Sequence, residues 1–150
     1  LGPNEGRPTL DRWVIDPSSG KVATETISDL GHEFPRHDER RIGKPIRFGY
    51  TGSLGDHLGI GPIYKHDLVE RTSELRLEGN GRAYLEPVFV PRTPESDEDD
   101  GWLLAYVYDK TTESSEFIVL DARDIAADPV ATVALPQRVP FGFHGSWMPD

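Results

Sequence analysis

The chain contains no cysteine among its 150 residues. Disulfides, thiolate metal sites and cysteine nucleophiles are therefore excluded, which leaves histidine and carboxylate side chains as the strong metal ligands. Long apolar runs are also missing, because no run approaches the roughly 20 residues of a membrane-spanning helix. The first residues lack the basic and apolar regions of a signal peptide. We therefore expect a cytoplasmic protein.

Basic residues are scarce relative to acidic ones. The chain has 16 Lys and Arg against 26 Asp and Glu, a formal net charge of −10. Nucleic acid is not an expected partner, because binding to phosphates needs clustered Lys and Arg. The one basic cluster, residues 36–47, is interrupted by acids and predicts a solvated, salt-bridged turn. With 13 Pro and 15 Gly, the composition is typical of one domain rich in turns.

Three segments share one design: residues 9–28, 61–77 and 102–121. In each, an apolar and aromatic strand ends in Asp, a short polar turn follows, and a second strand returns, which predicts a β-hairpin. Hairpins repeated at roughly 40 to 50 residues are typical of propeller blades.

The intervening segments have room for the other strands of each blade. Residues 45–51, 86–91 and 130–135 are candidate strands, and residues 122–128 are the only plausible turn of helix, α or 3₁₀. The sequence therefore predicts an all-β fold of about three blades. Because propellers close with roughly four to eight blades, the remaining blades belong to a missing N-terminal part, or a partner covers the open edges. The chain begins without Met, and we expect it to be a fragment.

Several catalytic patterns fail on spacing or context. His32 and His37 are five residues apart with a proline between them, so they cannot share a helix face as in zinc proteases. The acidic loop 94–101 lacks the register of an EF-hand, and we interpret it as a solvated connection. Ser53 and Ser146 lack the context of a hydrolase nucleophile.

One histidine has an unusual setting near the end of the chain. His144 lies in the apolar and glycine-rich segment 139–147, so we expect its imidazole to be buried. It is either a core residue bonded to the backbone or a metal ligand. Glu33 and Glu86 lie in apolar, proline-containing contexts, and each is either a solvent-facing strand residue or the carboxylate that orients a metal-bound His. The inner strands of propeller blades converge on one axis, where such residues meet.

Eight segments together resemble a known family. They are Gly31–Arg36, Gly43–Pro45 with Arg47–Tyr50, Ile63–Asp67, Glu86–Arg92, Asp99–Leu104, Val119–Ala122, Pro129–Val133, and Leu135–Pro136 with Arg138–Trp147. In this order they resemble the C-terminal third of the carotenoid cleavage oxygenases, which include lignostilbene dioxygenases and the retinoid isomerase of the eye.

The resemblance implies that residues 1–150 are the C-terminal portion of one catalytic domain, a seven-bladed β-propeller. It implies a non-haem Fe(II) ion on the axis, bound by four His, three of which are oriented by Glu. Carried over to this sequence, His144 is the last iron ligand, and Glu33 and Glu86 are two of the orienting carboxylates. The other three His and the third Glu belong to earlier blades outside this chain.

The other histidines do not match ligand motifs of the family. We expect His32, His37, His57 and His66 to lie at the surface or to pair between strands.

The resemblance also implies an activity, namely cleavage of a conjugated double bond of a carotenoid, apocarotenoid or stilbene by O₂ to carbonyl products. By position, Phe141, Phe143 and Trp147 are candidate walls of an apolar substrate pocket. Any peripheral membrane contact is expected through regions outside this chain, and the chain alone is expected to be inactive and iron-free. The alternative from another class is a metal-free propeller-type module for binding or assembly.

Overall fold

The computed structural model describes residues 9–54, 60–76 and 81–149. Within them the chain forms strands and one short 3₁₀ helix, and no helix there is long and apolar enough to cross a membrane. The elements are β1 (Leu10–Asp16), β2 (Lys21–Ser28), β3 (His32–Arg36), η1 (Glu39–Arg41), β4 (Phe48–Leu54), β5 (Ile60–Asp67), β6 (Thr72–Leu75), β7 (Arg82–Tyr84), β8 (Val88–Pro91), β9 (Gly101–Asp109), β10 (Ser114–Asp121) and β11 (Ala131–Ala134).

All three predicted hairpins form, as β1–β2, β5–β6 and β9–β10. The candidate strands between them appear as β4, β8 and β11, while β3 and β7 were not predicted. At 122–128, where a single turn of helix is predicted, the chain forms isolated turns and no helix; one is closed by the Asp124 N–H and the Asp121 carbonyl at 3.2 Å. Asp121 Oδ1 accepts the backbone N–H of Arg123, and Asp124 Oδ1 accepts that of Ala127. Such local side-chain bonds compete with helix formation.

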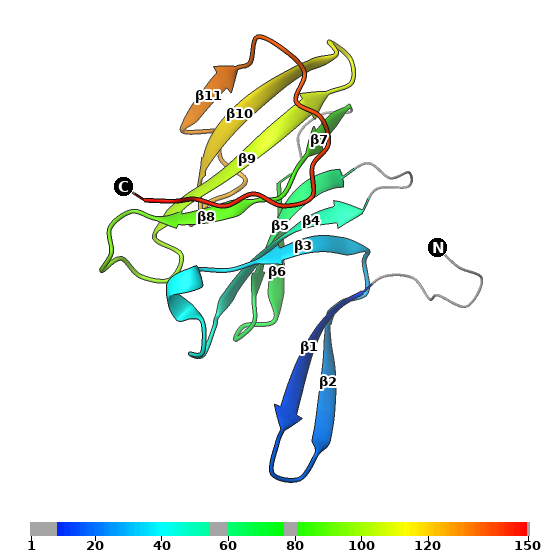
Figure 1. Ribbon diagram of the computed structural model, residues 1–150, viewed down its shortest axis with the longest axis vertical. Helices are drawn as coiled ribbons and strands as arrows, with labels where there is room; N and C mark the ends of the chain where they lie inside the picture. Colours follow the sequence, from blue (N-terminus) through cyan, green and yellow to red (C-terminus); the bar gives the residue numbers. More distant parts are fainter. Residues whose placement is uncertain (1–8, 55–59, 77–80, 150) are drawn as a thin grey trace, which may run out of the picture.

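Two antiparallel sheets, each four strand positions wide, make up the body of the structure (Figure 1). The first has the order β3-β4-β5-β6. The second has the order β11-β10-β9-β7, and β8 pairs with β9 further along the edge that β7 uses, so β7 and β8 together occupy one position. Four strand positions are the width of one propeller blade.

The β1–β2 hairpin stands apart from these sheets. It forms its own two-stranded sheet and projects away from the other two, joined to them at the start of β3 (Figure 1). Trp13 and Ile15 are 68% and 63% exposed on it. Of about three expected blades, two are present as complete sheets and the hairpin supplies two further strands.

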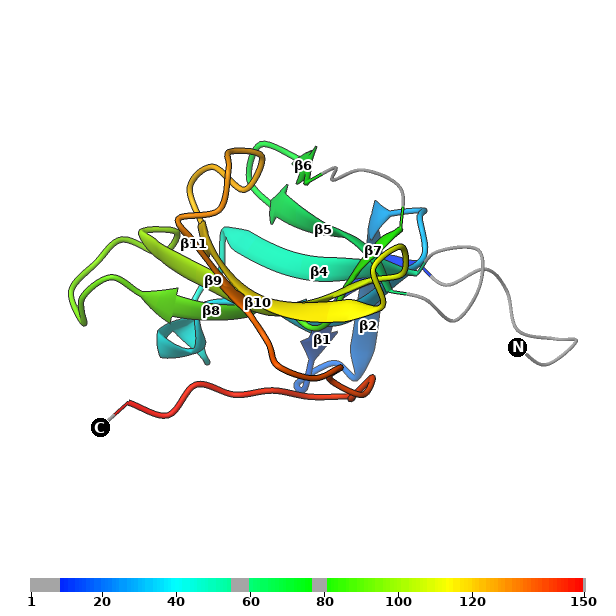
Figure 2. The same ribbon diagram turned by 90° about the horizontal axis from the view of Figure 1, so that it is seen from above.

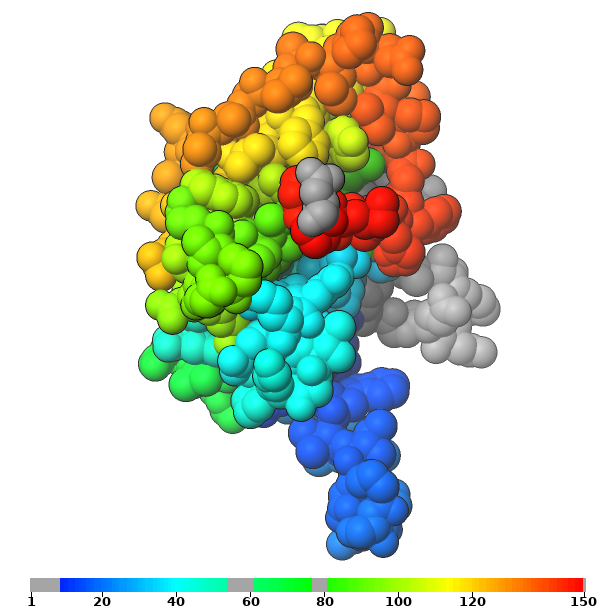
Figure 3. Space-filling model, turned by 60° about the vertical axis from the view of Figure 1, so that its left-hand side comes forward, coloured from blue at the N-terminus to red at the C-terminus, as the bar shows by residue number. Residues whose placement is uncertain are grey.

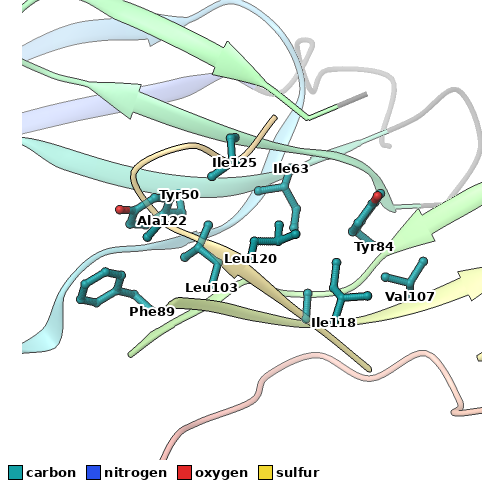
Figure 4. Packing of buried hydrophobic residues seen from close by; sticks show 11 residues of the cluster. Tyr50, Ile63, Tyr84, Phe89, Leu103, Val107, Ile118, Leu120, Ala122 and Ile125 are labelled. Atoms are coloured by element: carbon teal, nitrogen blue, oxygen red, sulfur yellow. The ribbon is translucent and has the colours of Figure 1, made fainter. Parts of the chain in front are cut away.

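The apolar core lies between the two sheets. Tyr50 and Ile63 of the first sheet face Leu103, Ile118 and other residues of the second, as Figure 4 shows. These four side chains are completely buried. The core therefore fixes how the two sheets pack face to face, as neighbouring blades do.

The acidic loop 94–101 also joins the two sheets, so its interpretation as a solvated connection is wrong for part of it. Glu98 accepts hydrogen bonds from the backbone N–H groups of Arg47 and Phe48, at 2.6 and 2.9 Å. Lys65 Nζ lies 2.9 Å from Asp99 Oδ2, and the Lys65 side chain is 9% exposed. These carboxylates fold inward because the backbone at the start of β4 and the buried Lys65 on β5 supply donors for them.

The salt bridges expected in the turn over 36–47 are confirmed, whereas the expected solvation of this turn is wrong for Asp38, which is 1% exposed. Arg40 pairs with Asp38 at 2.7 Å, and Arg47 pairs with Asp67 at 2.7 Å. Asp38 also accepts the backbone N–H of Arg40 and so begins η1.

Two of the histidines expected at the surface or in strand pairs, His32 and His66, are buried in the first sheet. Thr51 Oγ1 on β4 lies 2.9 Å from His32 Nδ1 on β3 and 2.9 Å from His66 Nε2 on β5. The outer ring nitrogens lie 2.8 Å from Ser28 Oγ and Ser73 Oγ. His32 and His66 are 7% and 1% exposed and sit in paired strands, so of the two expected placements, surface or strand pairing, the second is found.

Burial of these rings disfavours their charged forms. It lowers the pKa of His32, and it lowers the pKa of His66 to about 4, with a smaller contribution from the neighbouring His32. Both rings are therefore neutral at pH 7. His37 is half-buried just after β3, and His57 lies outside the described residues.

Candidate metal-ligand site

The C-terminal segment, residues 135–149, runs across the surface where the two sheets meet (Figure 3). It passes alongside β8 in Figures 1 and 2. Backbone N–H groups attach it at three points: Leu135 to the Ser115 carbonyl at 3.0 Å, Val139 to Ser115 Oγ at 2.9 Å, and Gly145 to Glu86 Oε2 at 2.5 Å. These bonds position His144, which precedes Gly145.

Glu86 lies in the short link between β7 and β8, both of which pair with β9. Its side chain is only 5% exposed. The carboxylate accepts from His144 Nδ1 at 3.2 Å, from the Gly145 N–H at 2.5 Å and from Arg36 Nη1 at 3.4 Å. A buried carboxylate is costly without such partners, so these contacts determine its position.

The bond to Glu86 fixes the tautomer of His144. Because a carboxylate can only accept, the proton of the neutral ring must be on Nδ1, and Nε2 keeps its lone pair. Within the described residues, no hydrogen bond uses Nε2. This is the state of a histidine ready to bind a metal through Nε2.

The expectation of a buried His144 is wrong for this chain, since its side chain is 73% exposed. Its ring contacts Glu86 through Nδ1 and packs edge to face on the ring of Phe34, at 5.6 Å between centroids.

On β3, the side chains of Glu33 and Phe34 have different surroundings. Glu33 is exposed, and across 9–54, 60–76 and 81–149 its carboxylate makes no hydrogen bond or ion pair. The β3–β4 register shifts between Glu33 and Arg36, and Phe34 has a φ of 55°. Such a bulge redirects side chains. The structure therefore brings Phe34 and Arg36, and not Glu33, into contact with the His144–Glu86 pair.

Sequence reasoning missed Phe34 and Arg36 as neighbours of the site. Both lie in the quoted segment Gly31–Arg36, and the only sequence signal was the proline between them, which marks an irregular strand.

A cavity of about 380 Å³ opens beside His144. Leu104 and Phe117 of the second sheet form one wall, and Phe143 and Trp147 of the C-terminal segment line it with His144. Phe141 is not part of this lining. Its ring packs edge to face on Tyr108 at 5.8 Å. The cavity is largely apolar, as a pocket for a hydrocarbon requires.

The described residues contain no group of three or more His, Asp or Glu arranged to bind a metal ion. They supply one suitable donor, the Nε2 atom of His144, with an orienting carboxylate behind it. This donor set fits one position of a metal centre built from several histidines, and it cannot complete such a centre.

An all-β array of blade-like sheets with a carboxylate-oriented histidine at their junction defines part of a propeller. The family model described as retinal pigment epithelial membrane protein matches residues 2–149. The carotenoid cleavage oxygenase of Mycobacterium tuberculosis is 40% identical over 152 residues, covering 97% of this chain and 30% of that protein. The chain therefore belongs to the carotenoid cleavage oxygenase family.

Other relatives agree in sequence and in structure. The apocarotenoid-15,15'-oxygenase of Synechocystis is 38% identical over 141 residues, covering 92% of this chain and 29% of that protein. A crystal structure of the cobalt-substituted Synechocystis enzyme superposes with a TM-score of 0.88 at 36% identity, covering 97% of this chain and 31% of its own. The all-β propeller prediction is thus confirmed. The chain spans about 30% of the length of the relatives it matches.

Proposed function

We propose that the complete protein is a non-haem Fe(II) dioxygenase that cleaves a conjugated carbon–carbon double bond to two carbonyl products, with O₂ as co-substrate. The observation that carries this proposal is the His144–Glu86 pair, in which a buried carboxylate 3.2 Å from Nδ1 leaves Nε2 available. The names of the relatives support a carotenoid or apocarotenoid substrate. A stilbene remains a candidate of the same apolar, conjugated class.

Each residue has a defined part in this proposal. His144 binds the metal through Nε2, and Glu86 holds the ring in the required tautomer and makes it a better donor. The Gly145 N–H fixes the other oxygen of Glu86. When bound, Fe(II) supplies the redox chemistry that activates O₂. Three further His and a third Glu are proposed to come from preceding blades outside this chain.

Glu33 is proposed as a second orienting carboxylate. Its carboxylate is exposed and unpaired within the described residues, so it is available to accept the N–H of a His from a preceding blade. It serves a different ligand from His144, which explains why no contact joins the two.

The apolar cavity beside His144 is proposed as part of the substrate pocket. Phe143 and Trp147 would pack against the conjugated chain and exclude water, while Phe141 supports the segment through Tyr108. We further propose a cytoplasmic enzyme whose contact with membranes, where its lipid-soluble substrate resides, uses regions outside this chain.

The test is a metal and product analysis of the complete protein, purified without oxygen and loaded with Fe(II). We expect one iron per chain and, from a panel of carotenoids, apocarotenals and stilbenes, paired carbonyl products that consume O₂. A protein that binds no iron and cleaves none of the panel would contradict the proposal and favour a metal-free binding module. The 150-residue chain alone is expected to bind no iron, because one His cannot hold Fe(II) against water.

A further inference from the structure

A cation from the neighbouring sheet reaches the carboxylate that orients His144. Arg36, at the end of β3, places Nη1 3.4 Å from Glu86 Oε1, the same oxygen that accepts from His144 Nδ1. Its Nη2 lies 2.9 Å from Glu39 Oε1 on η1. The Arg36 guanidinium therefore contacts Glu86 through one terminal nitrogen and Glu39 through the other.

Glu86 needs this cation because it is buried. Its other two partners are the His144 ring, which donates through Nδ1, and the Gly145 backbone N–H, which carries no formal charge. Among the described residues, Arg36 is the only Arg or Lys within ion-pair distance of Glu86. Removing one partner of a buried ion pair leaves an uncompensated charge, and the remaining carboxylate then turns toward water if it can. Such a turn would break the bond to Nδ1.

The backbone of β3 is shaped for this contact. The register shift between Glu33 and Arg36 and the φ of 55° at Phe34 replace regular pairing at this point. A bulky side chain at positive φ is strained, and strain of this kind persists where surrounding contacts impose it. The result is that Phe34 packs on the His144 ring while Arg36 reaches Glu86.

We propose that Arg36 is a positioning residue of the metal centre: it holds the Glu86 carboxylate in the orientation that bonds His144 and so raises the affinity of His144 for the metal. This inference rests on the proposed function, because it assumes that His144 binds a metal. It extends that function across the interface between two blades, since Arg36 belongs to one sheet and Glu86 to the other.

The test is a double-mutant cycle on Fe(II) affinity in the complete protein, measured by competition with a chelator. Arg36→Met should weaken Fe(II) binding about tenfold, the lower end of the range for residues that orient ligands. Glu86→Gln should weaken it at least as much. If Arg36 acts through Glu86, adding Arg36→Met to Glu86→Gln should cause no further loss, because coupled residues are not additive.

Two further variants separate positioning from simple destabilisation. Arg36→Lys keeps the charge. Its loss of Fe(II) affinity should therefore be less than half the loss in Arg36→Met. Arg47→Met removes another Arg paired with a carboxylate, Asp67, away from this site, and should leave Fe(II) affinity unchanged. The absorption bands of the Co(II)-substituted protein should shift in Arg36→Met and stay unchanged in Arg47→Met.

The outcomes distinguish this inference from the proposed function. Wild-type or increased Fe(II) affinity in Arg36→Met, or a loss that adds fully to that of Glu86→Gln, overturns the role of Arg36 while the wild type still binds iron. A wild-type protein that binds no Fe(II) overturns the proposed function itself. If Arg36→Met fails to fold, Arg36→Gln, which also removes the charge, replaces it in the cycle, and the same loss and the same non-additivity are required.

Discussion

His144 and His66 differ in how their second ring nitrogen is used. His66 is 1% exposed, and both of its nitrogens are bonded inside the first sheet, to Thr51 and Ser73. His144 is 73% exposed in its side chain and bonds Glu86 through Nδ1 alone. A buried histidine with both nitrogens satisfied contributes to the fold, whereas one with a free Nε2 backed by a carboxylate is prepared to bind a ligand.

The hydrogen bonds of Thr51 explain why no ring nitrogen of His66 is free. Its hydroxyl has one proton and lies between two ring nitrogens, so it donates to one and accepts from the other. The chain from Ser28 to Ser73 therefore runs in a single direction with both rings neutral. No lone pair of a ring nitrogen in it is left for a metal.

The largest expected effect is on His144. His144→Ala in the complete protein should abolish stoichiometric iron and cleavage, because a four-histidine centre would lose a ligand. His66→Gln should keep one iron per chain even though it weakens the fold. Iron content by elemental analysis checks both, and full iron in His144→Ala would reduce His144 to a packing residue.

The second effect is on pH stability. His66 has a folded pKa of about 4 against an unfolded value of about 6.5, so between these values the unfolded state binds more protons. The neutral His66 ring therefore stabilises the fold fully above pH 6.5, and this stabilisation is lost as the pH falls toward 4. The free energy of unfolding should change by about 3 kcal/mol over this interval.

Denaturant unfolding at pH 7 and pH 4.5 measures this change. His66→Gln, which does not titrate, should lose markedly less stability over the same interval. An equal pH dependence in the wild type and the variant would show that His66 is not the responsible group.

Glu86→Gln comes third. The amide can no longer provide a charged acceptor to His144 Nδ1, so Fe(II) affinity or turnover should fall roughly 10- to 100-fold. A chelator titration and initial rates of cleavage check this. Unchanged iron content and turnover would mean that the 3.2 Å contact has no part in metal binding.

The smallest effect is expected for Thr51→Val, which leaves ring nitrogens of His32 and His66 without their shared partner. Thr51 is 1% exposed, and the cost should be about 2 kcal/mol in unfolding free energy, with iron content unchanged. Thr24→Val, on the exposed face of β2, is the matched control and should be near neutral. Similar losses in both variants would contradict the account of the buried chain.

Much of the fold could be predicted because it depends on local pattern. The three hairpins follow from alternating strands that end in Asp, whose side chains bond the turn, as Asp109 does with Thr111. β3 and β7 were missed because one is bulged and the other has three residues, so neither shows a regular period.

The site was predicted only as far as residue chemistry allows. The sequence offered Glu33 and Glu86 as orienting carboxylates and His144 as a ligand without assigning either Glu to it, and the structure places Glu86 in contact with His144. The contacts of Phe34 and Arg36 depend on a bulge and on the packing of one sheet against the other, which no local pattern specifies. The burial of His32 and His66 also depends on neighbouring strands, since each sits in a polar stretch of sequence.

The most direct test is an anomalous difference map at the iron edge from crystals of the complete, Fe(II)-loaded protein. The account predicts one peak within bonding distance of His144 Nε2, with Glu86 bonded to Nδ1 on the opposite side of the ring. A peak away from His144, or His144 with both nitrogens bonded by protein groups as in His66, would contradict it.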